Sequence, residues 1–272
     1  MDYNDPEFNI NEFKFHTVKD VNIKETFSFT SHISVYETCS LQYKFFKELG
    51  FTPVRVGSTV FGQLVHQTIE DIHRAAIRGE YDKINSENIK QWFAINYATI
   101  SKNERTYLAK PQIEAALRQV FKYANKDEDY WKIIKDTEIE VGLVKPDYIL
   151  EGKIDLIRGD NDTVELVDFK SEKKPDLIKD KERIEHYKKQ LQIYAHLVEE
   201  KMGIEVSKMH IYYTSNEDGI PTISFAKDKK SIDETVHDFE NIVHKIQKKD
   251  FCTKAKSQLT CNECDFRHYC KS

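Results

Sequence analysis

The sequence predicts a mixed α/β (α+β) fold, in which a small mixed sheet is flanked by helices. Apolar residues recur at spacings of three and four residues up to about residue 130, a pattern typical of helices. From residue 138 apolar and polar residues alternate, which is typical of strands. A long helical pattern, two more strand patterns and a last helical pattern follow. We expect one domain over residues 28–272, preceded by a mobile arm or linker at residues 1–27.

The first part of this domain, residues 28–135, is predicted to be mainly helical. A first helix is expected over residues 33–46, and Gly50 would stop it. A second helix is expected to begin near residue 57, with Ser58 or Thr59 as its N-cap, because short hydroxyl side chains accept hydrogen bonds from the first helical N–H groups. A third helical stretch is expected from residue 86 to about residue 130.

The second part, residues 136–250, is predicted to contain the sheet. Strands are expected over residues 152–157 and 163–170, on either side of a turn at 158–162 whose Gly, Asn and Asp residues tolerate turn conformations. A helix over 180–202, strands over 208–213 and 221–225, and a helix over 232–246 are expected next. Residues 251–272 form a cysteine-rich tail.

The composition is that of a soluble globular chain. The 272 residues are 39% hydrophobic and 32% charged, and there is no apolar run near 18 residues that would span a membrane. The N-terminus lacks the basic start and apolar block of a secretory signal, so we expect an intracellular, cytoplasmic protein with no membrane partner. The net charge of −5 neither indicates nor excludes a nucleic-acid partner, because positive charge is needed only along the path of the substrate.

Two aspartates on the first pair of predicted strands form a candidate catalytic site. Side chains alternate along a strand with period two, so Asp168 and Lys170 share a face. An antiparallel partner can bring Asp155 beside Asp168, and two close carboxylates repel each other unless a cation lies between them. Oxygen ligands suit Mg²⁺ or Mn²⁺, and Lys170 adds a positive group beside the metal. These groups favour metal-assisted hydrolysis of a phosphodiester; the alternative is a surface hairpin with scattered charges.

Asp147 competes with Asp155 for the role of first carboxylate, because it forms a Pro-Asp pair upstream of Asp168. We prefer Asp155, which lies in a strand joined to the strand of Asp168 by a five-residue turn. Asp147 lies eight residues earlier, beyond the far end of that strand.

Three further side chains are candidate members of the same site. His66 follows Gly62 by one helical turn, and the glycine leaves room for another backbone to approach. The His66 imidazole is a possible metal ligand, although a structural or surface role is the alternative. Gln190 and Tyr194 lie at positions i and i+4, on one face of the helix that follows the Asp168 strand. There they can position a phosphate, the backbone or the lysine, whereas Tyr194 also suits a core position.

The cysteines suggest a second metal centre. In a reducing compartment, clustered cysteines indicate metal binding rather than disulfides. Four thiolates can hold a 4Fe–4S cluster or a structural Zn²⁺, and four of the five cysteines are candidates: Cys39, Cys261, Cys264 and Cys270. His268 is an alternative zinc ligand, and Cys252 is predicted to be an ordinary thiol. Such a centre would join the helical N-terminal part to the tail.

Together these motifs resemble a known family. They are Gly62-x3-His66, Gly152-x2-Asp155, Asp168-Phe-Lys170, Gln190-x3-Tyr194 and the set of four cysteines. They look like the RecB-type branch of the PD-(D/E)XK nucleases, and most like the subgroup with a cysteine-held iron–sulfur cluster, which includes the nuclease domain of AddB and the CRISPR-associated exonucleases. Residues 34–44 also resemble nuclease domains fused to UvrD-like helicases, although Ser40 stands where that pattern often has Pro. The resemblance spans residues 28–270.

The resemblance implies a restriction-endonuclease-like core and a role for each residue. Mg²⁺ or Mn²⁺ would be held by His66, Asp155, Asp168 and the carbonyl group of Phe169. Lys170 would orient or activate the attacking water and stabilise the developing charge. Gln190 and Tyr194 would support the site and contact DNA.

The implied activity is metal-dependent cleavage of DNA by an exonuclease that acts on single strands or duplex ends in repair, recombination or end processing. The chain would work alone or with a UvrD-like helicase in cis or in trans. Two alternatives stay open: a DNA-binding module with an idle nuclease centre, and a zinc-stapled structural domain without chemistry. The intact set of Asp155, Asp168 and Lys170 argues against the idle module.

Overall fold

The computed structural model describes residues 24–53, 57–159, 163–217, 219–252, 255, 258–262, 264–267 and 270. Residues 1–23 of the predicted arm, residues 160–162 of the predicted turn and His268 lie outside this range. Residues Glu25–Ser28, which include the last residues of the predicted arm, form strand β1. None of the described helices combines the length and the apolar character that a membrane span requires.

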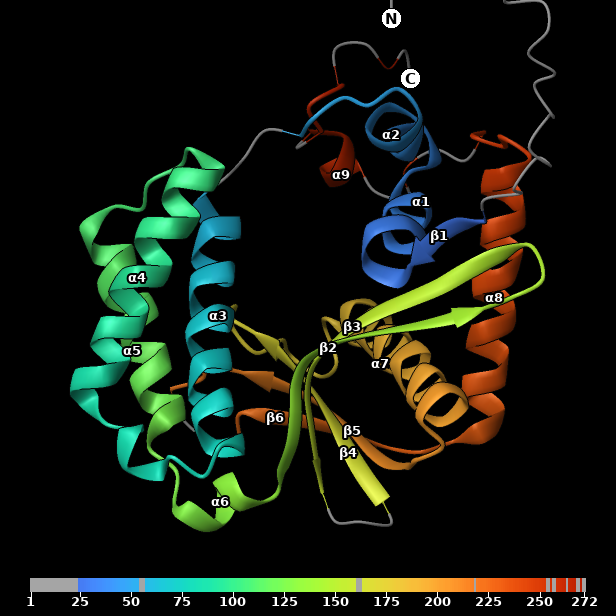
Figure 1. Ribbon diagram of the computed structural model, residues 1–272. Helices are drawn as coiled ribbons and strands as arrows, with labels where there is room; N and C mark the ends of the chain where they lie inside the picture. The colour runs from blue at the N-terminus through green and yellow to red at the C-terminus, as the bar shows by residue number, and fades with distance from the viewer. Residues whose placement is uncertain are drawn as a thin grey trace, which may run out of the picture.

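A six-stranded mixed sheet forms the centre of the described part of the chain (Figure 1). Its other strands are β2 (Ile134–Val144), β3 (Tyr148–Gly159), β4 (Thr163–Lys170), β5 (Glu205–Tyr213) and β6 (Thr222–Ala226). Along one edge, strand β3 pairs with β2 in antiparallel orientation. Along its other edge, the first residues of β3 pair with β1 in parallel orientation and the last residues pair with β4 in antiparallel orientation. The sheet continues with the parallel pair β4–β5 and the antiparallel pair β5–β6. The parallel pair requires a crossover, which helix α7 provides.

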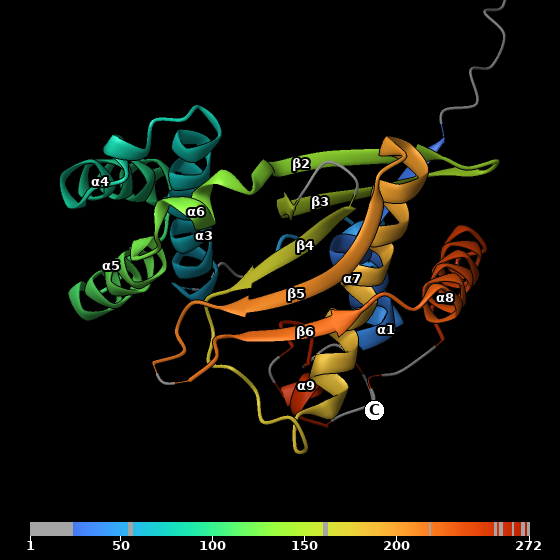
Figure 2. The ribbon, with the colours of Figure 1, turned by 90° about the horizontal axis from the view of Figure 1, so that it is seen from below.

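Helices cover both faces of this sheet (Figures 1 and 2). One face carries α3 (Gly57–Ile77), α4 (Ser86–Glu104), α5 (Lys110–Ala124) and α6 (Glu128–Lys132). The other face carries α7 (Lys181–Met202), α8 (Lys229–Gln247) and the short helices α1 (Ser34–Thr38) and α2 (Ser40–Tyr43). A last short helix, α9 (Gln258–Asn262), lies in the tail.

The alternation of side chains along β4 creates two separate cores. Val167 and Phe169 are buried among apolar residues of α3 to α6. Leu166, on the opposite face of the same strand, packs into a core built with α7 and α8. Asp168 and Lys170 share the Leu166 face at the end of β4, so the predicted division of this strand is confirmed.

Two predicted helices are interrupted. The stretch at residues 33–46 breaks at Cys39, whose extended backbone (φ −165°, ψ 114°) separates α1 from α2. The stretch from residue 86 to 130 divides into α4, α5 and α6, because Arg105 takes a left-handed conformation (φ 52°) and Pro111 lies in the first turn of α5. Apolar spacing alone does not reveal such breaks, since buried residues recur at helical spacings on both sides of them.

Most of the other predicted elements are close to those found. Strand β4 has the predicted ends, and α7 begins and ends within one residue of the prediction. Helix α3 includes Gly57, so Ser58 and Thr59 lie inside its first turn rather than at the predicted cap. Strand β3 begins at Tyr148, four residues before the predicted start at residue 152, because β2 pairs with its full length.

Candidate active site

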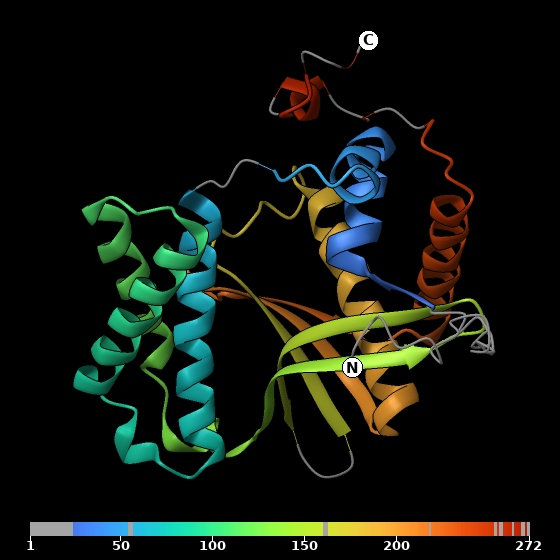
Figure 3. The same cartoon turned by 45° about the horizontal axis from the view of Figure 1, so that its top comes forward.

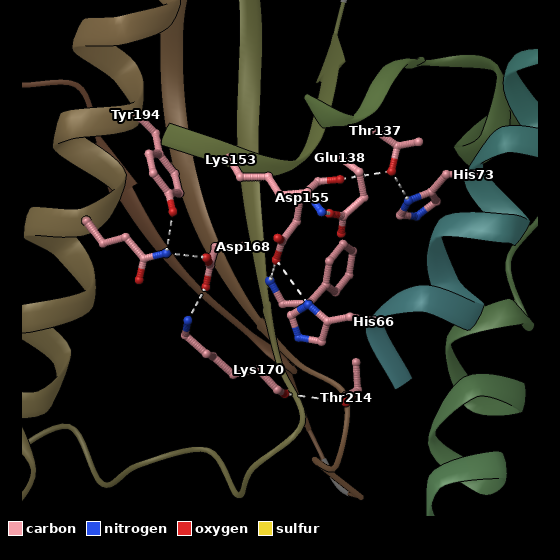
Figure 4. A network of polar contacts seen from close by, with 12 residues as sticks. His66, His73, Thr137, Glu138, Lys153, Asp155, Asp168, Lys170, Tyr194 and Thr214 are labelled. Carbon is pink, nitrogen blue, oxygen red and sulfur yellow. Dashed lines mark hydrogen bonds and ion pairs between the residues drawn. The ribbon is translucent and has the colours of Figure 1, made fainter. Parts of the chain in front are cut away.

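The two aspartates lie where β3 and β4 separate. The last paired residues of the two strands are Leu156 and Val167, and Asp155 and Asp168 are the next residue on each strand. The Oδ2 atom of Asp155 accepts a hydrogen bond of 2.8 Å from the backbone N–H of Phe169, which links the two strands just beyond their last pair. Figure 4 shows both carboxylates between α3 and α7. Asp147 is exposed at the opposite end of β3, so the geometry favours Asp155 as the first carboxylate.

A group of three possible ligands surrounds Asp155 on the α3 side. The Nδ1 atom of His66 lies 3.5 Å from Asp155 Oδ2. His66, Asp155 and Glu138 each have a ligand atom within 4.8 Å of those of the other two. Glu138 comes from β2, where it lies opposite Asp155. The three residues line a pocket of about 510 Å³, which is bounded by α3, α4, β2 and β3.

Glu138 was missed as a site residue in the sequence. Its backbone is left-handed (φ 53°), a conformation that is strained for a residue with a side chain. Next to it, the hydroxyl of Thr137 donates a 2.9 Å hydrogen bond to the carbonyl of Asp155 and lies 3.1 Å from Nδ1 of the buried His73. The one feature of the sequence that could have indicated Glu138 is its position as an acidic residue at the start of an alternating stretch. Hydrophobic periodicity does not indicate a left-handed residue inside a strand.

Asp168 is held from the opposite side, by α7. Its Oδ1 atom accepts a 2.7 Å hydrogen bond from Gln190 Nε2, which lies 3.0 Å from the hydroxyl of Tyr194. Its Oδ2 atom forms an ion pair of 2.7 Å with Lys170 Nζ. Gln190 and Tyr194 are each only 4% exposed, so they support Asp168 and present little surface for the DNA contact that was expected of them.

Gly152 explains how α7 comes so close to β3. A Cβ atom at this position would lie 2.7 Å from Leu197 Cδ1 and 3.0 Å from the ring of Tyr194. These distances are shorter than ordinary van der Waals contact, so only glycine allows the helix to pack here. The glycine of the Gly152-x2-Asp155 motif therefore positions the helix that holds Asp168.

The electrostatics of the site follow from burial and from the number of acidic groups. Burial and the nearby Asp168 raise the pKa of Asp155, and burial and Asp155 raise the pKa of Glu138. Burial lowers the pKa of His66 and so favours the neutral imidazole that can bind a metal. Burial also opposes the charge on Lys170, but Asp168 and Asp155 outweigh it and raise its pKa, so Lys170 stays protonated. The Lys170 ammonium group also lies 4.6 Å from the centre of the Tyr187 ring.

These residues fit a divalent cation. The donors are carboxylate oxygens and one imidazole, which suit Mg²⁺ or Mn²⁺. The mutual repulsion of the buried carboxylates is what a bound cation would relieve. The backbone of Phe169 acts against the burial that lowers the pKa of His66 and therefore lies beside the group. Asp168 is not a member of the three-residue group, because its carboxylate points to Lys170 and Gln190.

The N-terminal helices and the tail lie side by side (Figure 3). The Phe266 ring stacks on that of Phe45 with centroids 4.2 Å apart, and Gln42 Nε2 lies 3.8 Å from the Sγ atom of Cys264. Cys39, Cys261 and Cys264 are half-buried, whereas Cys252 and Cys270 are exposed. In the described part of the chain the cysteine sulfurs do not gather into a group within 4.8 Å of one another.

Comparison with known proteins identifies the family. The family model of the PD-(D/E)XK nuclease superfamily matches residues 26–271. The crystal structure of a candidate exonuclease from Eubacterium rectale is similar over 91% of this chain and 89% of that chain, with a TM-score of 0.59 and 12% identity, which supports the shared fold. The crystal structure of SSO0001 matches over 85% of this chain and 94% of that chain with 17% identity, but its TM-score of 0.35 is too low for an argument. No curated protein sequence matches the chain.

The mixed sheet flanked by helices is the restriction-endonuclease-like core of this superfamily. Asp155 of β3 and the Asp168–Lys170 pair of β4, which lie where the pairing of these strands stops, are in the matched range. The chain belongs to the PD-(D/E)XK nuclease superfamily.

Proposed function

We propose that this protein is a Mg²⁺- or Mn²⁺-dependent deoxyribonuclease that acts as an exonuclease on single strands or duplex ends. The observation that carries the proposal is that the His66, Glu138 and Asp155 group and the buried Asp168–Lys170 ion pair lie where strands β3 and β4 separate. Membership of a nuclease superfamily and similarity to a candidate exonuclease support the reaction type.

Each residue has a role that follows from its surroundings. A bound divalent cation would polarise the phosphodiester and lower the pKa of a bound water. His66, Asp155, Asp168, Glu138 and the Phe169 carbonyl would hold this ion. Lys170 is protonated and lies beside Asp168, so it can stabilise negative charge that develops on the phosphate and orient the attacking water. Gln190 and Tyr194 keep Asp168 in place from the buried side.

A cleavage assay tests the reaction and its need for a DNA end. Linear DNA with labelled ends and covalently closed circular DNA would be incubated with Mg²⁺, with Mn²⁺ and with a chelator. We expect metal-dependent loss of the linear DNA, while the closed circle persists. Lys170→Ala should abolish cleavage, whereas Lys173→Ala, an exposed lysine in the loop after β4, serves as the matched control and should cleave normally.

The assay also separates this proposal from the idle DNA-binding module. Cleavage of both DNA forms would contradict the exonuclease assignment and leave a nuclease. Binding of DNA without cleavage of either form, under every metal condition, would contradict the nuclease and favour the idle module.

We also propose that the four cysteines Cys39, Cys261, Cys264 and Cys270 hold a 4Fe–4S cluster, with structural Zn²⁺ as the alternative. The packing of Phe45 against Phe266 supports the proposal, because it brings the segment of Cys39 to the tail. Metal binding that ties distant segments together contributes to the free energy of folding.

Iron and zinc analysis of single variants tests the cluster. Cys39→Ala and Cys264→Ala should lose metal and melt at a lower temperature to a similar extent, and Cys252→Ala should do neither. A brown purified protein would indicate iron–sulfur, and a colourless one with stoichiometric zinc would indicate the alternative. Full metal content in Cys39→Ala would show that the N-terminal helices do not contribute to the centre.

The proposed biological setting is DNA repair, recombination or end processing. The likeness of residues 34–44 to helicase-linked nuclease domains suggests a UvrD-like helicase, in cis or in trans, as the partner that supplies unwound ends. Stimulation of cleavage by such a helicase and ATP, compared with ATP alone, would test this partnership.

A further inference from the structure

The pocket beside Asp155 extends beyond the possible metal ligands. Its lining also includes three amide side chains, Gln63 and Gln67 of α3 and Asn103 of α4, and the apolar Ile100. Gln63 and Gln67 are four residues apart and therefore share a helix face with each other. Asn103 and Ile100 are three residues apart on α4, which packs beside α3. Amide side chains from α3 and α4 thus line the same pocket.

These three amides are available to a ligand. Their side chains are exposed to the pocket, and within the described part of the chain none of them forms a hydrogen bond or an ion pair. Each amide offers both a donor and an acceptor group. Paired donors and acceptors of this kind match the edges of nucleobases, which amide side chains bind in a bidentate manner.

The charge of the pocket decides which part of a nucleotide can contact these amides. Four acidic residues line the pocket: Glu70, Glu104, Glu138 and Asp155. Lys153 is the lysine in its lining, and its ammonium group forms an ion pair of 2.5 Å with Glu138. An additional phosphate would meet repulsion here, whereas an uncharged group with donors and acceptors would not.

We propose that Gln63, Gln67 and Asn103 form a subsite for the unpaired nucleobase of the nucleotide next to the scissile phosphate. The proposal rests on the proposed nuclease function, because it places the phosphate at Asp155 and the base beside it. The base edge meets the amides, and Ile100 supplies an apolar contact for the ring. A volume of about 510 Å³ is in the range of small-molecule sites, so the pocket takes one unstacked nucleotide rather than a base pair.

Binding of mononucleotides tests the subsite independently of catalysis. The four 2′-deoxynucleoside 5′-monophosphates and 2-deoxyribose 5-phosphate, which lacks the base, would be titrated into the full chain by calorimetry, with Ca²⁺ as the cation. We expect at least one mononucleotide to bind roughly tenfold more tightly than the sugar phosphate, since one pair of base contacts has about this effect. The variants Gln67→Ala and Asn103→Ala should each remove most of this advantage.

A matched control and a second measurement separate the possible outcomes. Gln91→Ala changes an exposed amide of α4 that does not line the pocket, and it should keep the full advantage. Equal binding of the mononucleotides and the sugar phosphate, or an advantage retained in both pocket variants, would overturn the subsite. DNA cleavage without a base advantage would contradict the subsite and leave the nuclease. A base advantage in a protein that cleaves no DNA would support the subsite and contradict the proposed reaction.

Discussion

The two sides of the candidate active site differ in the exposure and the contacts of their carboxylates. On the α3 side, Asp155 and His66 line an open pocket, and their side chains are 15% and 28% exposed. On the α7 side, the Asp168 side chain is 5% exposed and is held by Lys170 and Gln190. The α3 side, called the open side below, has room for ligands. The α7 side, called the closed side, holds one carboxylate in a fixed position. Substitutions on the two sides should therefore fail in different ways.

The largest effect is expected on the closed side. Asp168→Asn keeps the shape of the side chain but removes the charge that pairs with Lys170. We expect the rate of DNA cleavage to fall about a thousandfold or more at every metal concentration. Cleavage rates at saturating Mn²⁺, together with thermal melting to verify the fold, would measure this. Activity restored by additional metal would show that Asp168 acts only as one ligand of the ion and not through its ion pair with Lys170.

A smaller effect of another kind is expected on the open side. His66→Ala removes the imidazole from the three-residue group but leaves the carboxylates. The metal concentration for half-maximal cleavage should rise by about 10- to 100-fold, by analogy with losses of other groups at metal sites. A metal titration would measure it, with the exposed His237→Ala of α8 as the control. A metal titration like that of the unaltered protein would assign His66 a structural role.

The packing of the closed side is tested by adding one methyl group. Gly152→Ala would place a Cβ atom 2.7 Å from Leu197, and the forced shift of α7 should lower the free energy of unfolding by about 1–3 kcal/mol. The control is Gly142→Ala, where the nearest atom would be 3.9 Å away in Ile149, so little change is expected. Denaturant unfolding of both variants would measure the difference. Equal stability of the two variants would mean that α7 can move without cost.

The smallest effect concerns the support of the open side by His73. Burial lowers the pKa of this histidine from 6.5 to about 3, so the unfolded chain binds the additional proton. The contribution of His73 to stability is complete above pH 6.5 and is lost as the pH falls toward 3. His73→Asn should reduce the pH dependence of the unfolding free energy in this window by up to about 1.4 kcal/mol per pH unit. Unfolding curves between pH 4.5 and 8 would measure this pH dependence. If it were the same in His73→Asn and in the unaltered protein, His73 would not be neutral in the folded state.

The parts of the molecule that were predictable from the sequence are those that depend on local pattern. Strand β4 and helix α7 follow from strong alternation and from a long apolar stripe. The approach of Asp155 to Asp168 follows from one hairpin register. The metal roles of these residues stay predictions, as do the cysteine cluster and the contact with DNA.

The features that the sequence did not reveal depend on tertiary contacts. The inclusion of Glu138 in the pocket arises where β2 meets β3 and α3. The same is true of the His73–Thr137 contact, which joins α3 to β2. The secondary-structure propensity of a residue contains no information about such tertiary contacts, because His66 and His73 lie more than 60 residues from their partners on β2.

The left-handed backbone of Glu138 has a consequence for anyone who engineers this chain. Glycine adopts this conformation freely, whereas other residues are disfavoured in it by roughly 1–2 kcal/mol. A stabilisation strategy guided by backbone geometry would therefore select Glu138→Gly, and the same change would remove a carboxylate from the group around Asp155. Position 138 is thus one at which a thermostability screen and an activity screen should choose different residues.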